Sequence, residues 1–133
     1  MNAHTKTVQQ QMLELLVEKF PKCFFSIHEK PKPLKIGINN DLSITFATEL
    51  TDERFSKNMW LFFLWYTNRK PYLKAMVAEG AMRVNLEGEE VEPVNEYAGK
   101  YALEKLEGIL EKENERKAHQ MPKTLKNIQE HAK

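Results

Sequence analysis

Hydrophobic side chains recur at helical spacing near the start of the chain. In residues 7–20 they follow an i, i+4, i+7, i+8 pattern, which is typical of an amphipathic helix with one buried face. The residues of this pattern are Val8, Met12, Leu15, Leu16 and Phe20. Thr7 can cap the helix because its hydroxyl accepts a hydrogen bond from a free backbone N–H, and Pro21 ends it.

A segment without regular periodicity follows this helix. Residues 21–33 hold three prolines and are predicted to form a loop. Three side chains are expected to anchor the loop to the core: Cys23, Phe24 and Phe25. Residues 33–38 (PLKIGI) are predicted to be short and extended, with Gly37 permitting a sharp bend. A helix from Asn40 or Asp41 to residue 49 is expected next, with these side chains buried: Leu42, Phe46 and Ala47.

The centre of the chain is its most apolar part. Thr51 or Asp52 can cap a helix whose middle, residues 59–66 (MWLFFLWY), is apolar on every side. Such a pattern is typical of a helix surrounded by other elements. The sequence therefore predicts a fully buried central helix.

Shorter elements come after the central helix. Residues 67–70 are expected to turn into a short helix that begins with Pro71 and that Gly80 closes. Apolar and polar residues then alternate over residues 82–86, and the two residues after them can form a tight turn. With a returning strand over residues 89–94, this pattern predicts a small β-hairpin.

The chain ends in a long helical pattern and a polar tail. A helix is predicted over residues 95–117, with apolar and aromatic positions near helical spacing: Tyr97, Tyr101, Leu103, Leu106, Ile109 and Leu110. Residues 1–6 and 118–133 are expected to be a flexible N-terminus and a flexible basic tail. The sequence thus predicts one domain over residues 7–117, mostly α-helical with a small β-hairpin (α+β).

The total charge says little until its arrangement is considered. The chain has 133 residues with 20 Lys and Arg against 19 Asp and Glu, a formal net charge of +1. Residues 54–78 hold five basic and no acidic side chains, residues 87–115 hold ten acidic and three basic ones, and residues 116–133 hold five basic and one acidic. Such an arrangement can create one electropositive face, although charge runs are also typical of solvated helix surfaces.

No pattern in the chain favours catalysis, a metal or a cofactor. The four histidines lack paired ligand spacing, and the single cysteine excludes an internal disulfide. Cys23 lies among apolar neighbours, so burial is expected rather than a nucleophile–base pair with His28.

The longest apolar run spans eight residues and no secretory signal begins the sequence, which predicts a cytoplasmic protein with no membrane partner. We expect no enzyme activity.

Basic and aromatic residues form the pattern that remains. Lys35 follows a Pro-Leu pair, and Arg83 projects from the polar face of the hairpin. The predicted turn and the start of the next helix hold the others: Arg69, Lys70, Tyr72 and Lys74. Tyr72 can stack on a base or donate its hydroxyl to a phosphate or ribose. The alternative is that Tyr72 belongs to the core and that the charges only solubilise the surface.

Six motifs in order resemble those of the ProQ/FinO domain, a family of bacterial RNA chaperones. They are FPKCF (20–24), PLKIGI (33–38), Asp41-Leu42, YT (66–67), YLKAM (72–76) and GAMRVNLEG (80–88). The resemblance covers residues 7–110. It implies a mostly α-helical domain with one hairpin that binds structured RNA, typically terminator hairpins with a single-stranded, U-rich 3′ end, in small-RNA-based post-transcriptional regulation.

The resemblance also implies roles for individual residues. Lys35, Tyr72 and Arg83 match motif residues that contribute to RNA binding in the family, and Lys57 matches a basic residue early in the central helix. Some relatives carry two arginines, four residues apart, before the YT pair. Trp60 and Leu64 occupy those places here, so Arg69, Lys70 and Lys74 are expected to supply compensating charge along the RNA stem.

A protein-interaction adaptor is the alternative to an RNA chaperone. In this hypothesis the acidic helix over residues 95–115 faces a basic partner. A monomer without cofactor is expected in either case.

Overall fold

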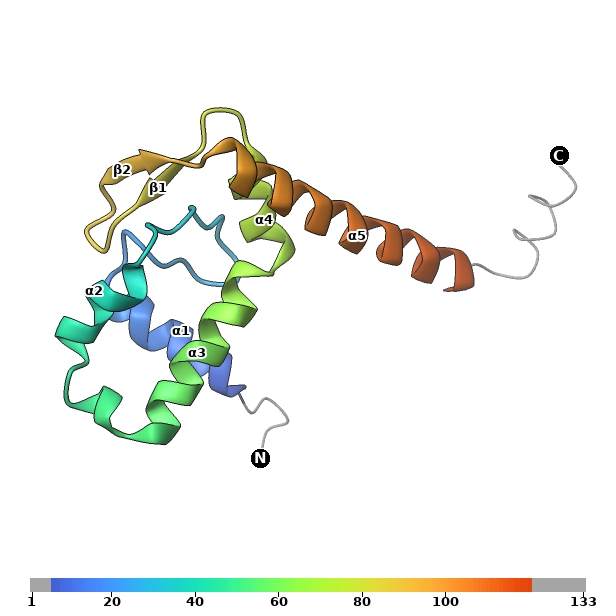
Figure 1. The fold of residues 1–133 in the computed structure, drawn as a ribbon. Coiled ribbons are helices and arrows are strands. Elements are labelled where there is room, and N and C mark those ends of the chain that lie inside the picture. Colours follow the sequence, from blue (N-terminus) through green and yellow to red (C-terminus); the bar gives the residue numbers. More distant parts are fainter. Residues whose placement is uncertain (1–5, 121–133) are drawn as a thin grey trace, which may run out of the picture.

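A computed structural model describes residues 6–120 of the chain (Figure 1). Its elements, in order, are α1 (Val8–Lys19), α2 (Ile38–Thr45), the 3₁₀ turn η1 (Glu49–Thr51), α3 (Glu53–Thr67), α4 (Lys70–Val77), β1 (Met82–Val84), β2 (Glu90–Pro93) and α5 (Glu96–Gln120). The predicted mostly α-helical fold with one hairpin is therefore confirmed. Of the predicted flexible ends, residues 1–5 and 121–133 lie outside the described part, whereas residues 118–120 continue α5.

The first and third helices begin where side-chain caps predict. The Thr7 hydroxyl accepts from the N–H of Gln10 at 3.1 Å, and the Gln10 side chain accepts from the N–H of Thr7 at 3.0 Å. Asp52 accepts from the N–H groups of Arg54 and Phe55 at 2.8 and 3.3 Å. Both caps satisfy backbone donors that a helix start leaves free. α1 and α3 then pack side by side.

The second helix lies earlier than predicted. It begins at Ile38 rather than at residue 40 or 41 and ends at Thr45, because Gly37 adopts a φ of 82° and turns the chain into the helix. Phe46 is buried as predicted, but Ala47 is exposed since it lies beyond the helix end.

The central helix is buried on one face only, which corrects the prediction of full burial. Met59, Phe62 and Tyr66 are buried in α3, at 6%, 0% and 0% exposure. Trp60 and Leu64 are instead 61% and 45% exposed. Apolar composition alone does not establish burial, because a protein surface also carries many apolar atoms. The exposed face of α3 borders the candidate site.

An additional strand-like contact joins the extended PLKIGI segment to the hairpin. β1 and β2 pair antiparallel, with Arg83 opposite Glu92 and an irregularity in the register after Arg83. On its other side β1 forms a parallel bridge between Val84 and Leu34. The N–H of Lys35 donates to the Val84 carbonyl, and the N–H of Val84 donates to the Pro33 carbonyl, each at 2.9 Å. This bridge places the PLKIGI segment beside the hairpin.

The last helix packs through a narrower stripe than its apolar pattern predicts. Ala102 and Leu106 of α5 are buried with Leu73 of α4, and Ile109 is partly buried against them. Four of the predicted apolar positions are exposed instead: Tyr97, Tyr101, Leu103 and Leu110. α5 packs mainly against α4, and its Lys105 also donates to the Asn68 side chain in the turn before α4. The rest of α5 leads away from the fold (Figure 1).

Replacing Gly88 with alanine is expected to destabilise the fold by about 1–3 kcal/mol. Gly88 has a φ of 82°, and a Cβ there would lie 2.6 Å from Lys22 Cβ and 2.8 Å from the Lys22 carbonyl oxygen. Gly80→Ala is the matched control, since Gly80 has a φ of 71° but nothing within 4 Å of its added Cβ. Urea unfolding should show the larger loss for Gly88→Ala. Equal losses would mean that the contact with Lys22 relaxes freely.

Candidate nucleic-acid interface

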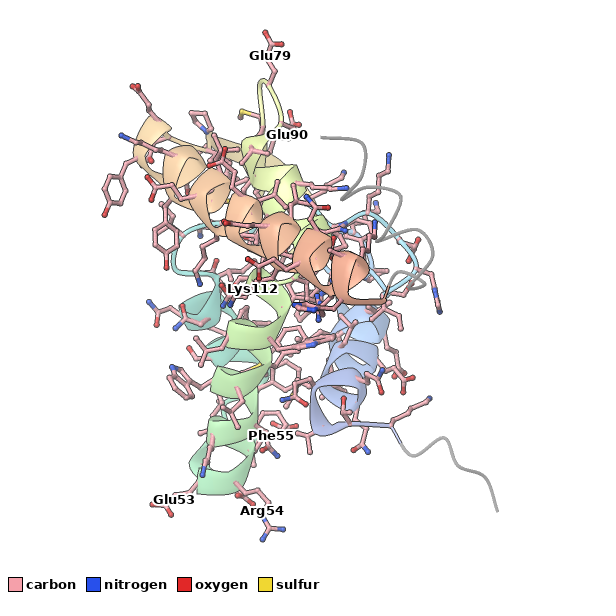
Figure 2. All side chains as sticks on the ribbon, turned by 90° about the vertical axis from the view of Figure 1, so that its right-hand side faces the viewer. Glu53, Arg54, Phe55, Glu79, Glu90 and Lys112 are labelled. Carbon is pink, nitrogen blue, oxygen red and sulfur yellow. The ribbon has the colours of Figure 1, made fainter. Side chains whose placement is uncertain are left out.

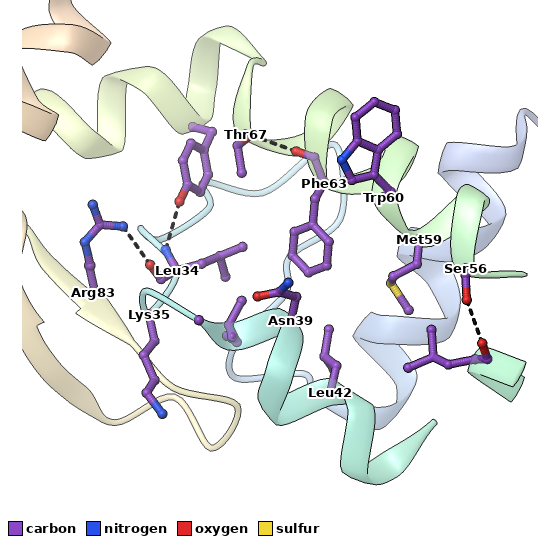
Figure 3. A pocket seen from close by; sticks show the side chains of 14 residues that line it. Leu34, Lys35, Asn39, Leu42, Ser56, Met59, Trp60, Phe63, Thr67 and Arg83 are labelled. Carbon is purple, nitrogen blue, oxygen red and sulfur yellow. Dashed lines mark hydrogen bonds between the residues drawn. The ribbon is translucent and has the colours of Figure 1, made fainter. Parts of the chain in front are cut away.

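A cavity of about 470 Å³ lies between α2, α3, the start of α4 and the hairpin (Figure 3). It is lined by Leu34, Lys35, Gly37, Ile38, Asn39, Leu42, Leu50, Ser56, Met59, Trp60, Phe63, Thr67, Tyr72 and Arg83. Lys35, Tyr72 and Arg83 come from three separate motifs, and the bridge between Leu34 and Val84 brings them together. The structure thus gathers three of the seven predicted site residues in one place.

The backbone N–H and carbonyl of Leu34 each bind one of these side chains. Arg83 donates from Nη1 to the Leu34 carbonyl at 2.9 Å, and the Tyr72 hydroxyl accepts from the Leu34 N–H at 2.9 Å (Figure 3). The Nε of Arg83 is buried and has no hydrogen-bond partner within residues 6–120. Because Nε is itself inaccessible, an anionic oxygen in the cavity can be bound only by the rest of the guanidinium, which the hydrogen bond to Leu34 holds in the cavity wall.

Tyr72 presents its hydroxyl rather than its ring. The residue is 4% exposed and its ring centroid lies 5.7 Å from that of Tyr66. Stacking of a base on Tyr72, one of its two predicted roles, is therefore incompatible with this packing. Burial raises the pKa of the hydroxyl, which stays protonated at neutral pH. Because it accepts from Leu34, its own proton is available to a ligand oxygen.

Lys35 forms an ion pair that remains accessible to solvent. Its Nζ lies 2.8 Å from Asp41 Oδ2, and both side chains are 35% exposed. The hydrogen bond to Asp41 raises the pKa of Lys35, so the amine is fully charged at neutral pH. Gly37 and the first turn of α2 border the same space and add the partial positive charge of a helix N-terminus. An anion entering here meets positive charge from two directions.

The other end of the cavity is apolar and aromatic. Met59, Trp60 and Phe63 of α3 line it opposite Leu42 of α2 (Figure 3). The motifs did not single out Phe63 or Asn39 as site residues. Phe63 lies inside the apolar run, and its spacing alone does not separate a core position from a cavity wall.

Lys70 and Lys74 lie on a different surface, formed by α4 and the loop before α2. They border a hollow of about 580 Å³ together with His28, Glu29 and Lys30. Lys70 is ion-paired with Glu113 of α5, its Nζ lying 2.9 and 3.1 Å from the two carboxylate oxygens. This hydrogen bond lowers the pKa of Glu113, so the pair stays charged at neutral pH. The acidic helix therefore neutralises part of this basic surface.

Arg69 is packed into the aromatic cluster instead of lying free in the turn. Its guanidinium carbon lies 4.9 Å from the ring centroids of both Trp65 and Tyr66. Its Nε and Nη2 are buried without hydrogen-bond partners in the described part of the chain, and burial lowers its pKa. Arg69 does not border the cavity and offers less accessible charge than the sequence predicted.

Lys57 lies near the start of α3. It borders a shallow hollow with Arg54 and Asn58 and is exposed. Figure 2 shows Arg54 pointing outward at this end of the molecule, opposite the end that carries Glu79. Lys57 therefore does not line the cavity that Lys35, Tyr72 and Arg83 share.

Cys23 has the environment of a structural cysteine. It is fully buried, and burial together with the nearby Glu87 carboxylate raises the pKa of its thiol to about 12. The thiolate needed for nucleophilic chemistry is therefore not formed at neutral pH.

Comparisons with known proteins agree on one family. The model of the ProQ/FINO family matches residues 6–119. The RNA chaperone ProQ of Idiomarina loihiensis is 42% identical over 101 residues, which cover 75% of this chain and 46% of that protein. The RNA chaperone ProQ of Haemophilus ducreyi is 35% identical over 125 residues, which cover 93% and 66%. The chain thus spans about half the length of several curated relatives that it matches.

A solved structure shows the same fold. The solution structure of a ProQ homolog from Legionella pneumophila superposes with a TM-score of 0.63 at 30% sequence identity, covering 81% of this chain and 88% of that one. In the described part of this chain, no helix combines the length and apolar character required to cross a membrane.

Proposed function

Because the chain belongs to the ProQ/FinO family, we propose that it is an RNA chaperone that binds structured RNA. Its preferred ligand is a terminator hairpin with a single-stranded, U-rich 3′ end, and its role is small-RNA-based post-transcriptional regulation in the cytoplasm. It acts as a monomer by binding, without catalysis or a cofactor. The observation that carries this proposal is the convergence of Lys35, Tyr72 and Arg83 at one end of a cavity.

The polar end of the cavity fits the phosphates and ribose of the last nucleotides. Arg83 contributes a guanidinium that Leu34 fixes in the cavity wall, and Lys35 contributes a charged amine that a phosphate shares with Asp41. The Tyr72 hydroxyl can donate to a phosphate oxygen or to a ribose 2′-OH, the group that separates RNA from DNA. The cavity's volume of about 470 Å³ is in the range of pockets that hold one small ligand, which fits the end of a single strand.

The duplex stem contacts the remaining basic side chains. Lys57 on one surface and Lys70 and Lys74 on another can bind the stem backbone with little base recognition, since the deep A-form major groove hides sequence. Arg69 contributes less because its guanidinium is packed against two rings. Lys70 retains part of its attraction despite Glu113, because both side chains of this pair are about one-third exposed.

A gel-shift titration of three nucleic acids tests the proposal. They are an RNA hairpin with a 3′ U tail, the same hairpin without the tail, and duplex DNA. We expect clear preference for the tailed RNA, and an affinity that falls steeply as salt rises because phosphate contacts release counterions. Lys35→Ala should reduce this preference, whereas Lys100→Ala, an exposed lysine of α5 outside the cavity, should not.

Absence of binding at low salt would contradict the proposal and favour the adaptor hypothesis. The acidic residues of α5 are then the candidate contact for a basic partner. Equal affinity for tailed and tail-less RNA would retain RNA binding but remove the 3′-end site.

Affinity for the tailed RNA is expected to stay constant between about pH 6.5 and 9. The pKa values of Lys35 and Tyr72 are both raised, so the lysine keeps its charge and the tyrosine its proton throughout this range. Fluorescence anisotropy at constant ionic strength measures the dissociation constant. A tenfold loss across the range would show that a different titrating group controls binding.

A further inference from the structure

The two ends of the cavity differ in chemistry. Lys35, Tyr72 and Arg83 lie at the polar end, and Trp60 lies at the opposite, apolar end (Figure 3). Both ends open into one space, so a single ligand can contact them together. Such a ligand must carry negative and hydroxyl groups on one side and a flat apolar surface on the other.

Trp60 has an exposed indole that the fold does not use. It is 61% exposed and does not belong to the hydrophobic core, whereas Trp65 on the same helix packs against that core. Leu64, one turn further along α3, is 45% exposed but does not line the cavity. Among the exposed large hydrophobic residues of the described chain, Trp60 alone combines exposure with a place in the cavity wall.

An unpaired nucleotide matches both ends. Its phosphate and ribose fit the charged and hydroxyl groups, and its base offers a π-face to an aromatic ring. Stacking of a base on an aromatic side chain is strong, tolerates any base, and requires an unpaired nucleotide. A base-paired stem cannot present that face to the cavity.

We propose that Trp60 is a base-stacking residue that binds one unpaired nucleotide of the RNA 3′ tail at the apolar end of the cavity. The inference rests on the function proposed above and adds a specificity-determining contact to it. The phosphate contacts at Arg83 and Lys35 position the strand, and the indole then selects single-stranded over paired nucleotides. The contact does not depend on charge, so its contribution persists as salt rises.

Abasic nucleotides provide the test. In a tailed hairpin, one tail base at a time is removed while its ribose and phosphate remain. With the parent protein, removal at one position should weaken binding by about tenfold. Trp60→Ala should weaken binding of the intact tailed RNA by a similar factor. Removing the base at that same position should then weaken binding to Trp60→Ala no further, because two groups in contact give non-additive effects. Trp60→Phe should restore most of the affinity.

Two controls separate stacking from a general loss of apolar surface. Leu64→Ala removes a neighbouring exposed side chain, and Tyr97→Ala removes an aromatic ring that is 82% exposed on α5 and outside the cavity. Neither should change affinity for the tailed RNA. Intrinsic fluorescence gives a direct readout: tailed RNA should quench the parent, and much less so Trp60→Phe, which keeps only Trp65.

The outcomes distinguish this inference from the function on which it rests. If the parent prefers tailed RNA but Trp60→Ala binds it equally well, the stacking site is wrong and the 3′-end site stands. A loss that is equal for tailed and tail-less hairpins would place Trp60 against the stem and also overturn the inference. No preference of the parent for tailed RNA would overturn both.

Discussion

Replacing Tyr72 with alanine is expected to destabilise the protein by about 3–5 kcal/mol, the range for truncating a buried aromatic side chain. Tyr72 is 4% exposed, its ring packs against Tyr66, and its hydroxyl accepts from the N–H of Leu34 at 2.9 Å. The alanine variant loses the ring, leaves a cavity and removes the acceptor for a buried N–H. Urea unfolding monitored by circular dichroism measures the loss.

Tyr72→Phe separates stability from RNA contact. It keeps the ring and removes only the hydroxyl, so the expected loss of stability is about 1–2 kcal/mol from the unpaired Leu34 N–H. If the hydroxyl also contacts RNA, the folded phenylalanine variant should bind the tailed hairpin several-fold more weakly than the parent. An alanine variant within 1 kcal/mol of the parent would contradict the structural role, whichever way RNA binding changes.

Features with local chemical causes were predictable from the sequence. The caps at Thr7 and Asp52, the proline at the start of α4 and the alternation in the hairpin each depend on a few neighbouring residues. The exposed faces of α3 and α5 were not predictable in this way. An apolar helix does not specify which of its sides another element covers: Trp60 lies in the helix predicted to be fully buried and Tyr101 in the apolar pattern of the last helix, and both are exposed.

The candidate site also combines residues that the sequence identified with contacts that it could not predict. The order of the motifs identified Lys35, Tyr72 and Arg83, but their meeting depends on one bridge between Leu34 and Val84 and on an Arg83–Leu34 hydrogen bond across 49 residues. No local pattern encodes such a contact. Arg69 shows the converse, because a basic residue in a turn favours exposure whereas two neighbouring rings bury its guanidinium.

The acidic helix changes the interpretation of the charge pattern. Its Glu113 pairs with Lys70, one of the predicted stem contacts, so the two charge runs are in contact rather than on separate faces. In the cavity Lys35 is likewise paired with Asp41, whereas Arg83 forms no ion pair with any residue between 6 and 120. Charge that is already paired contributes less to a new ligand than charge that is unmet. The cavity is therefore expected to dominate affinity for RNA.

Arg83→Ala is accordingly expected to weaken binding of the tailed hairpin by about 100-fold, on the order of 2–3 kcal/mol for a lost charge-assisted contact. Binding of the tail-less hairpin should change little, because the stem lies outside the cavity. Arg83→Lys keeps the charge but loses the planar fork that binds Leu34 and a phosphate together, so it should recover only part of the loss.

Arg116→Ala is the matched control for Arg83→Ala, since it removes the same charge from an exposed position on α5. A purely electrostatic role for Arg83 predicts equal effects of the two variants, both vanishing at high salt. A fixed guanidinium at the 3′ end predicts that only Arg83→Ala abolishes the preference for the 3′ tail, and that this variant also lowers the salt dependence of binding because one phosphate contact is lost. Loss of affinity must be measured on folded protein, because Arg83 also satisfies the Leu34 carbonyl at 2.9 Å. A variant that folds and keeps the full preference for the tail would place the 3′ end elsewhere than beside Leu34.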